Sequence, residues 1–372
     1  MPRLTTAAEP QPATKVQFVL SVPLDLMNAM NFTSLVPHID GLEGWPVRVR
    51  DEMAPDLLAE LDFLCTYPKG GDEQGVMTML ADALWLYPES WKDVGSLLRF
   101  VRAMPLQVGD LVGDRVGVQG LVYYAALLQS WEEDWRPDPD LTPREEIERE
   151  LVRSGTDPAP ALALYDRPQE LRERMARLIE RFYEEHYKAE LPNRLPCLER
   201  SAAAHRADVH KDPIALQKQL TGRTSACLGD LCAREYDRIY FAPSLDMGPY
   251  TSCSIHPNLH SLFYPCEPEF AGTGEGPDAA ETQRLARVYK ALGDEQRLKI
   301  LGLLREREMY AQEIVERTGL HQSVISRHLS FMRVVGLLNV RRENNMKFYS
   351  LNPEIREQLN KTLDLFAPSA AR

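Results

Sequence analysis

The chain has 372 residues, of which 44% are hydrophobic and 26% charged, with 43 Lys+Arg against 55 Asp+Glu and a net charge of -12. These proportions match those of globular proteins and exclude a chain that is wholly disordered, fibrous or stapled by disulfides. No apolar run approaches the roughly 18 residues of a membrane span, and the mean hydropathy is -0.35. The length leaves room for two domains.

The N-terminal residues and the cysteines both indicate the cellular compartment in which the protein is expected. Residues 1–15 are rich in Ala, Pro and Thr and lack the apolar stretch of a secretory signal, so we expect a disordered start. Six cysteines without tight, even spacing are typical of a reducing environment. Together these features predict a cytoplasmic protein without a membrane segment.

The segment 16–266 is expected to form an α-rich body with a little sheet. Apolar residues recur there every three or four positions. The predicted helices are 74–87, 91–104, 118–135 and 169–189. Short runs rich in β-branched and aromatic residues predict strands at 15–22, 237–242 and 259–264. Two proline-containing stretches, 136–143 and 154–160, are expected to be surface loops or a subdomain seam.

Motifs for enzyme chemistry are missing from the sequence. We find no Gly-x-Gly-x-x-Gly after a strand, no phosphate-binding P-loop, no His-Glu-x-x-His and no Gly-x-Ser-x-Gly. We therefore predict no catalytic residue and no cofactor. Adjacent carboxylates such as Glu145 and Glu146 are most simply explained as solvated faces.

Two groups of residues in the body leave alternatives open. One group has the side chains of metal ligands, but its spacing fits no familiar zinc pattern, so we predict no metal and favour structural roles. Its members are Cys227, Cys232, Cys253, His256, His260 and Cys266. The second group is aromatic and is expected either to fill the core or to line a ligand cavity. Its members are Trp85, Tyr87, Trp91, Tyr123, Tyr124 and Trp131.

A linker and a small basic module follow the body. Residues 267–281 hold three Gly and two Pro and have little to bury. The segment 282–352 has 13 Lys+Arg against 7 Asp+Glu, a net charge of +6, which leaves -18 on the rest of the chain. Such a local positive charge favours a polyanionic partner even though the whole chain is acidic.

The basic module shows the pattern of a helix-turn-helix followed by a hairpin. The predicted helices are 283–292, 296–305, 310–318 and 321–335. Gly319 separates the last two, which is the helix, tight turn, helix arrangement. Residues 337–342 and 347–351 alternate in hydropathy around Asn344 and Asn345, which predicts a β-hairpin wing with a basic tip. This order of elements is that of a winged helix.

The last of these helices has the composition of a helix that binds in the major groove. Ile325, Leu329 and Met332 form the packing face, while Arg, Gln and Ser side chains on the other face suit base edges and phosphates. His328 fits a buried, a phosphate-contacting or a base-contacting role. The predicted DNA contacts are Tyr310, Gln312, His321, Gln322, Ser323, Val324, Ser326, Arg327, His328, Arg333, Arg341, Arg342, Asn344, Asn345 and Lys347.

These motifs together resemble the ArsR-type winged-helix repressors. The resemblance covers about 70 residues and includes the Leu-Gly-Asp-x-x-Arg-Leu opening at 292–298, Ser-Arg-His-Leu at 326–329 and the Phe348-Tyr349 strand. It implies a homodimer that binds an imperfect palindrome and responds to an inducer. Metal-sensing members carry cysteines before the turn, where this chain has Glu308-Met-Tyr-Ala-Gln312, and residues 282–372 contain no cysteine.

The layout also resembles long ArsR-type regulators with a large N-terminal domain, on the segments 18–24, 241–244 and 263–265. We therefore predict a DNA-binding transcriptional repressor whose body, 16–266, senses a small-molecule effector. The alternatives are a body that only dimerises and docks proteins, or an enzyme fused to a DNA-binding module. A final helix at 353–366 is a second candidate for the dimer contact.

Overall fold

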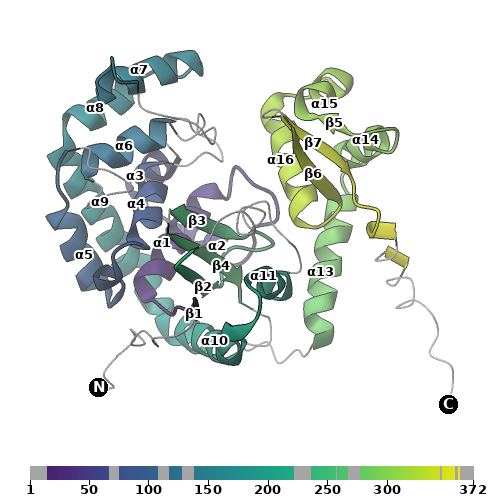
Figure 1. Ribbon diagram of the computed structural model, residues 1–372, viewed down its shortest axis with the longest axis horizontal. Helices are drawn as coiled ribbons and strands as arrows, with labels where there is room; N and C mark the ends of the chain where they lie inside the picture. Colours follow the sequence, from purple (N-terminus) through teal and green to yellow (C-terminus); the bar gives the residue numbers. More distant parts are fainter. Residues whose placement is uncertain are drawn as a thin grey trace. The chain divides into compact units, whose positions relative to one another are not determined.

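The computed structural model describes residues 15–66, 75–107, 117–127, 138–221, 236–256, 258–266, 277–343, 346–356 and 359–360. The chain divides into two compact units, and Figure 1 labels the helices and strands of both. The body unit is 1–38 with 42–271, and the C-terminal unit is 39–41 with 272–372. The division after residue 271 falls within the predicted linker, 267–281. The predictions of a mainly helical chain with a little sheet and of a C-terminal winged helix-turn-helix are confirmed.

The body unit contains a four-stranded mixed sheet in the order β1-β2-β4-β3. The strands are β1 (Val16–Phe18), β2 (Arg238–Ser244), β3 (Ser252–His256) and β4 (Leu259–Pro265). β2 pairs in parallel with β1 and β4, whereas β3 is antiparallel to β4. The prediction lacked β3, and its first strand was too long. That strand stops at Phe18 because Ser21 caps the next helix, accepting the N–H of Leu24 at 3.3 Å.

Helices cover both faces of this sheet, as strand alternation requires. Ile239 and Phe241 lie on the face that packs against Leu216 and Leu220 of α11. Tyr240 points the other way, and its ring centroid lies 6.1 Å from that of Trp85. The described helices of the body unit are α1 (Val22–Leu35), α2 (Trp45–Glu52), α3 (Pro55–Thr66), α4 (Val76–Leu84), η1 (Pro88–Trp91), α5 (Val94–Ala103), α6 (Val118–Leu127), α7 (Pro143–Arg153), α8 (Ala159–Asp166), α9 (Pro168–Phe182), η3 (Tyr183–Tyr187), η4 (Lys188–Glu190), α10 (Leu191–Ala204), η5 (Arg206–His210) and α11 (Pro213–Thr221).

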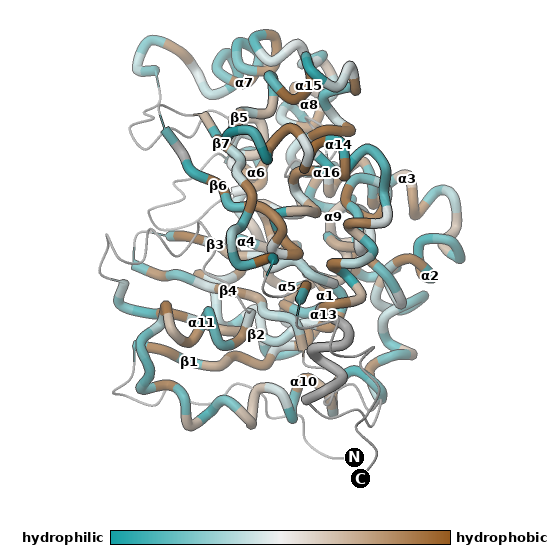
Figure 2. The backbone as a smooth tube through the Cα atoms, turned by 90° about the vertical axis from the view of Figure 1, so that its right-hand side faces the viewer, coloured by the Kyte–Doolittle hydropathy of each residue, from teal (hydrophilic) through white to brown (hydrophobic). Residues whose placement is uncertain are grey.

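Helix α9 is the amphipathic helix that the sequence predicted most clearly. Leu171, Met175 and Phe182 are buried on one side, and Figure 2 shows hydrophobic stretches in brown interrupted by hydrophilic ones in teal along the chain. Neither this helix nor any other described one is long and apolar enough to span a membrane.

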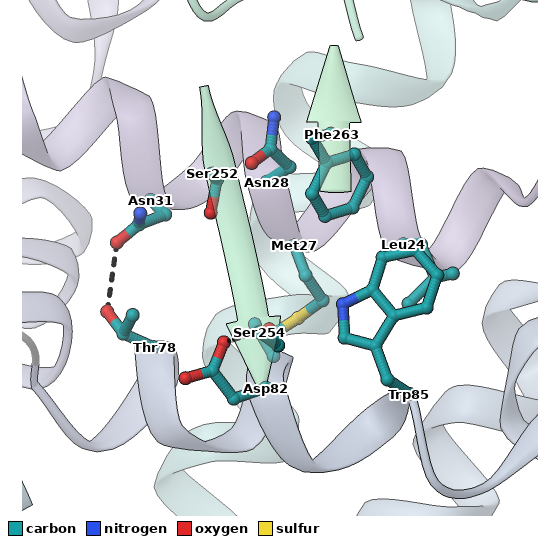
Figure 3. Close-up of a pocket in the computed structure, with 11 residues that line it drawn as sticks. Leu24, Met27, Asn28, Asn31, Thr78, Asp82, Trp85, Ser252, Ser254 and Phe263 are labelled. Atoms are coloured by element: carbon teal, nitrogen blue, oxygen red, sulfur yellow. Dashed lines mark hydrogen bonds between the residues drawn. The ribbon is translucent and has the colours of Figure 1, made fainter. Parts of the chain in front are cut away.

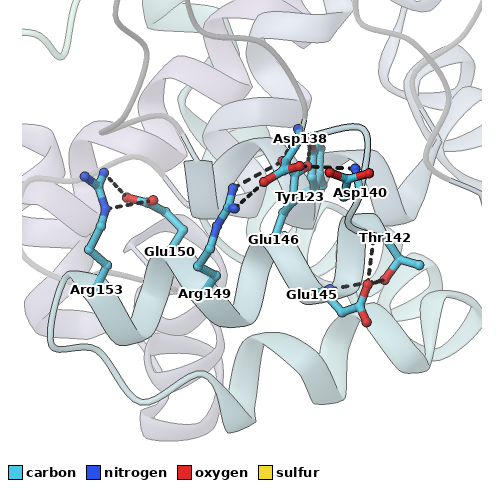
Figure 4. A network of polar contacts seen from close by, with 9 residues as sticks. All are labelled: Tyr123, Asp138, Asp140, Thr142, Glu145, Glu146, Arg149, Glu150 and Arg153. Carbon is cyan, nitrogen blue, oxygen red and sulfur yellow. Dashed lines mark hydrogen bonds and ion pairs between the residues drawn. The ribbon is translucent and has the colours of Figure 1, made fainter.

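Glu146 corrects one prediction. We expected it on a solvated face, but it is only 2% exposed and accepts the hydroxyl of Tyr123 on α6 (Figure 4). Its other carboxylate oxygen accepts the N–H of Asp138 at 2.7 Å. Glu145 is as solvated as predicted, and it closes a capping box with Thr142 at the start of α7. The adjacent carboxylates therefore have different roles, because one faces α6 and the other faces water.

A buried ionic cluster joins distant parts of the body unit. The Arg194 guanidinium on α10 is paired with Asp25 of α1 at 2.7 Å and with Asp246 after β2. It also lies 4.9 Å from the ring centre of Trp45 and 4.7 Å from that of Tyr187, a cation–π arrangement. The Tyr187 hydroxyl donates to Asp25 at 2.5 Å. Through these contacts the buried Arg194 connects α1, α10 and the sheet.

The elements described in the C-terminal unit include helices and a small sheet. The helices are α13 (Pro277–Leu292), α14 (Glu295–Leu304), α15 (Ala311–Thr318) and α16 (Gln322–Val334). The strands β5 (Met309–Tyr310), β6 (Leu338–Glu343) and β7 (Met346–Leu351) form an antiparallel sheet in the order β5-β7-β6. α13 begins six residues before the predicted start. Most of the predicted final helix, 353–366, lies outside the described residues.

Candidate nucleic-acid interface

The turn between α15 and α16 is set by Gly319. Its φ of 69° is left-handed, which glycine adopts without steric cost. An added Cβ would meet no atom within 4 Å, so the requirement is one of backbone conformation and not of space. After the turn, the ring of His321 caps α16 by accepting the N–H of Ser323 at 3.3 Å. The sequence predicted both helices and this break.

Helix α16 has one buried and one solvent-facing side. Ile325, Leu329 and Met332 are buried, as the predicted packing face required. At the start of the helix, His321, Gln322, Ser323 and Ser326 are exposed, and Val324 is half-buried. Backbone N–H groups of a first helical turn have no intrahelical acceptor and attract anions. The exposed end of α16 therefore offers both hydrogen-bonding side chains and a positive helix terminus.

His328 lies inside the unit and not on this surface. Its ring is 4% exposed, and its Nε2 lies 3.0 Å from the Gln296 side-chain oxygen. Of the three roles that the sequence left open for His328, the structure favours the buried one. We leave His328 out of the interface that we propose below.

Arg327 lies beside a carboxylate that the sequence did not predict. Residues 39–41 belong to the C-terminal unit, and Asp40 Oδ1 lies 3.5 Å from Arg327 Nε. Asp40 Oδ2 is 3.0 Å from Arg297 Nη1. Burial alone would raise the pKa of Asp40, but the hydrogen bond to His328 and the charges of Arg327 and Arg297 lower it below its usual value. Arg297 belongs to the Leu-Gly-Asp-x-x-Arg-Leu motif, whereas nothing in the sequence around Asp40 pointed to this contact.

The wing is a regular hairpin whose charge is partly compensated. β6 and β7 pair with Arg341 opposite Phe348 and Arg342 opposite Lys347. The Arg341 guanidinium forms ion pairs with Glu308 at 2.6 Å and with Glu343 at 2.5 Å, and these two hydrogen bonds raise its pKa above the usual value. Glu308, like Asp40, was not among the predicted site residues.

The remaining predicted contacts differ in how far the structure describes them. Gln312 at the start of α15, Arg333 near the end of α16 and Lys347 on β7 are exposed, and Tyr310 is half-buried. Arg342 is described only through its backbone in β6. Asn344 and Asn345 lie outside the described residues.

The metal-ligand alternative finds no geometric support within the described part of the chain, where no three His, Cys, Asp or Glu side chains are grouped to hold an ion. Cys253 is disulfide-bonded, a state that the argument for a reducing compartment did not anticipate. His256 Nε2 lies 3.1 Å from the backbone oxygen of Asp82. Cys227 and Cys232 lie outside the described residues.

Comparison with known proteins gives matches to the C-terminal unit. Residues 294–340 match the family model described as bacterial regulatory protein, arsR family. The transcriptional activator HlyU of Vibrio cholerae is 41% identical over 65 residues, which are 18% of this chain and 60% of that protein. The arsenical resistance operon repressor of Staphylococcus xylosus is 31% identical over 87 residues, 23% of this chain and 84% of that protein.

One solved structure is the homodimeric winged helix-turn-helix DNA-binding domain of Mb0332 from Mycobacterium bovis, a possible ArsR-family transcriptional regulator. It is 30% identical and covers 26% of this chain and 91% of its own, with a TM-score of 0.22. HlyU from Vibrio cholerae also matches, at 29% identity and a TM-score of 0.20, over 26% of this chain and 100% of its own. All these matches leave most of the body unit uncovered.

Proposed function

Because the chain belongs, through its C-terminal unit, to the arsR family of bacterial regulatory proteins, we propose that it represses transcription by binding a palindromic operator as a homodimer. The observation that carries this proposal is the exposed first turn of α16, which follows a left-handed Gly319 and presents Gln322, Ser323 and Ser326. A helix so placed fits the major groove, where its first residues reach base edges. Relatives include repressors and an activator, so the sign of regulation needs its own measurement.

A selection and binding experiment tests DNA recognition. DNA that the full-length protein selects from a random pool is labelled, and affinity is measured by fluorescence anisotropy across a salt series. We expect binding to the selected sequence about 10³-fold or more tighter than to random DNA, with a steep salt dependence. Equal affinity for both would overturn the proposal.

Arg327→Ala separates base contacts from general attraction. If Arg327 leaves Asp40 to contact a base, the variant should lose about 1–3 kcal/mol on the selected sequence and relax preference at one base pair. Arg167→Ala removes the same charge from an exposed position in the body unit and is the matched control. The same loss on every sequence would assign Arg327 to phosphate contact. A reporter gene behind the selected sequence then gives the sign of regulation.

The homodimer is proposed from the family resemblance, and two side chains offer a surface for it. Tyr289 on α13 is 43% exposed and Leu298 on α14 is 51% exposed, both unusually open for large hydrophobic residues. Light scattering of the full chain and of Leu298→Glu measures the assembly. A monomer at the concentration at which the selected DNA is bound would contradict this part of the proposal.

The body unit is proposed to sense a small effector, and a cavity between its helices and its sheet supports this role. Eleven residues line the cavity, among them Trp85 of the aromatic group that the sequence singled out. An effector that favours one arrangement of the chain would change operator affinity, typically by about 1–3 kcal/mol. A body that only docks proteins would show no saturable small-molecule binding, and an enzyme would turn over its ligand.

A further inference from the structure

The cavity of the body unit has a buried floor and a half-exposed rim (Figure 3). Helices α1 and α4 form one side, and strands β3 and β4 form the other. Leu24, Met27 and Trp85 lie on the buried floor, whereas Asn31 and Ser252 on the rim are half-buried. The cavity measures about 20 Å³, which is room for one water-sized group. A ligand would place only a small head group there and extend past the rim.

Two side chains at this cavity, Asp82 and Asn28, have oxygen atoms that can accept a hydrogen bond from a ligand. Within the described residues, the Asp82 carboxylate receives one hydrogen bond, from the Ser254 hydroxyl at 2.5 Å, and has no Lys or Arg partner. Asn28 uses its amide nitrogen on Ser244 at 2.7 Å, which leaves its oxygen to accept. The Asn31 oxygen is occupied by the hydroxyl of Thr78 at 2.9 Å. A group that donates several hydrogen bonds would complete this set.

The acidic side chain and the aromatic rings at the cavity also favour a cationic ligand. A partly buried carboxyl group without a cation is costly to ionise, and burial raises the pKa of Asp82 to about 7. The rings of Trp85 and Phe263, with centroids 5.2 Å apart, also line the cavity. Aromatic faces attract cations, most strongly where water is excluded. A cation in the cavity would gain from both the carboxylate and the rings.

We propose that this cavity binds the ammonium group of a small primary amine, with Asp82 and Asn28 accepting its N–H bonds against the walls formed by Trp85 and Phe263. The size of the cavity selects a bare ammonium head over a methylated one. The effector would then be a small primary amine. The inference that this amine regulates DNA binding rests on the sensing role proposed above.

Calorimetric titration of the full-length protein with ethylammonium chloride tests the binding. We expect saturable binding that tetramethylammonium chloride at equal ionic strength does not reproduce, because four methyl groups exceed the cavity. Asp82→Asn, which matches the shape of the carboxyl group but stays neutral, should weaken ethylammonium binding about 10-fold or more. Asp51→Asn, at an exposed position of α2, removes the same charge and is the matched control.

The outcomes separate this inference from the function on which it rests. Absence of saturable binding, or equal binding of both cations by the wild type, overturns the amine site whether or not the variant folds. Unchanged binding by Asp82→Asn also overturns it. If ethylammonium binds as expected but leaves the affinity for selected DNA unchanged, the amine site stands and the sensing role fails. If selected DNA is bound and no amine is, the amine site fails and the DNA-binding proposal stands.

Discussion

Asp82→Asn isolates the cost of ionising a carboxyl group inside the body unit. Burial raises the pKa of Asp82 from 3.8 to about 7, although the Ser254 hydrogen bond opposes the rise. The folded protein thus keeps this proton up to about pH 7, whereas the unfolded chain releases it near pH 4. Since the folded state binds more protons in that window, its stability falls as pH rises from about 4 to 7 and is constant above. At about 1.4 kcal/mol per pKa unit, the whole loss is roughly 4 kcal/mol.

The variant lacks this titration, so wild-type stability relative to the variant should fall by about 1 kcal/mol between pH 6 and 7 and be nearly constant from about pH 7.5 to 8.5. His256, whose pKa burial lowers, is present in both proteins and cancels in the difference. Urea unfolding followed by tryptophan fluorescence measures the body unit, because all five tryptophans lie between residues 45 and 135. A difference that does not change from pH 6 to 8.5 would refute the inference that folding desolvates this carboxyl.

Three further substitutions test the charges of the two units. Arg194→Met should cost about 3–5 kcal/mol in urea unfolding because Asp25 and Asp246 would remain buried without their cation; a loss equal to that of Arg167→Ala would contradict the cluster's role. Asp40→Asn should raise affinity for DNA of any sequence about 2- to 5-fold in anisotropy titrations, since it removes the carboxylate beside Arg327; affinity equal to that of Asp51→Asn would show that Asp40 does not compete with DNA. Arg341→Ala should lower the slope of log affinity against log salt by about 0.9 if Arg341 contacts phosphate, and an unchanged slope would mean that Glu308 and Glu343 keep it in the complex.

The C-terminal unit could be predicted from sequence because its signals are local. Gly319 marks the turn, and the apolar spacing of Ile325, Leu329 and Met332 fixes which face of α16 is buried. The burial of His328 depended on Gln296, which lies 32 residues earlier. The contact of Asp40 with Arg297 spans 257 residues and left no periodic trace. Side chains whose environment is made by distant residues were therefore the ones that the sequence left open or missed.

The body unit shows the same limit more strongly. α9 was evident from its own apolar stripe, whereas the role of Glu146 depends on Tyr123, 23 residues away on another helix. The Arg194 cluster joins residues 169 positions apart, and each member looks like an ordinary surface charge in its own segment. β3 was missed because its sequence, Ser-Cys-Ser-Ile-His, lacks β-branched and aromatic residues apart from Ile255. Its pairing with β4 supplies the stability that local propensity does not.

Some basic side chains of the C-terminal unit are already paired with carboxylates, and this pairing affects how strongly the unit would bind DNA. The sequence assigns a net charge of +6 to residues 282–352, yet Arg341 is paired with Glu308 and Glu343, and Arg327 lies against Asp40. A phosphate that takes either arginine must displace a carboxylate, so part of the electrostatic gain is lost in breaking an existing pair. The N–H groups at the start of α16 have neutral acceptors, since the His321 ring accepts the N–H of Ser323 and the His321 backbone oxygen accepts that of Val324, so a phosphate there separates no ion pair. The affinity for DNA should therefore depend less steeply on salt than the count of basic residues implies, and the end of α16 should carry a larger share of it than the wing.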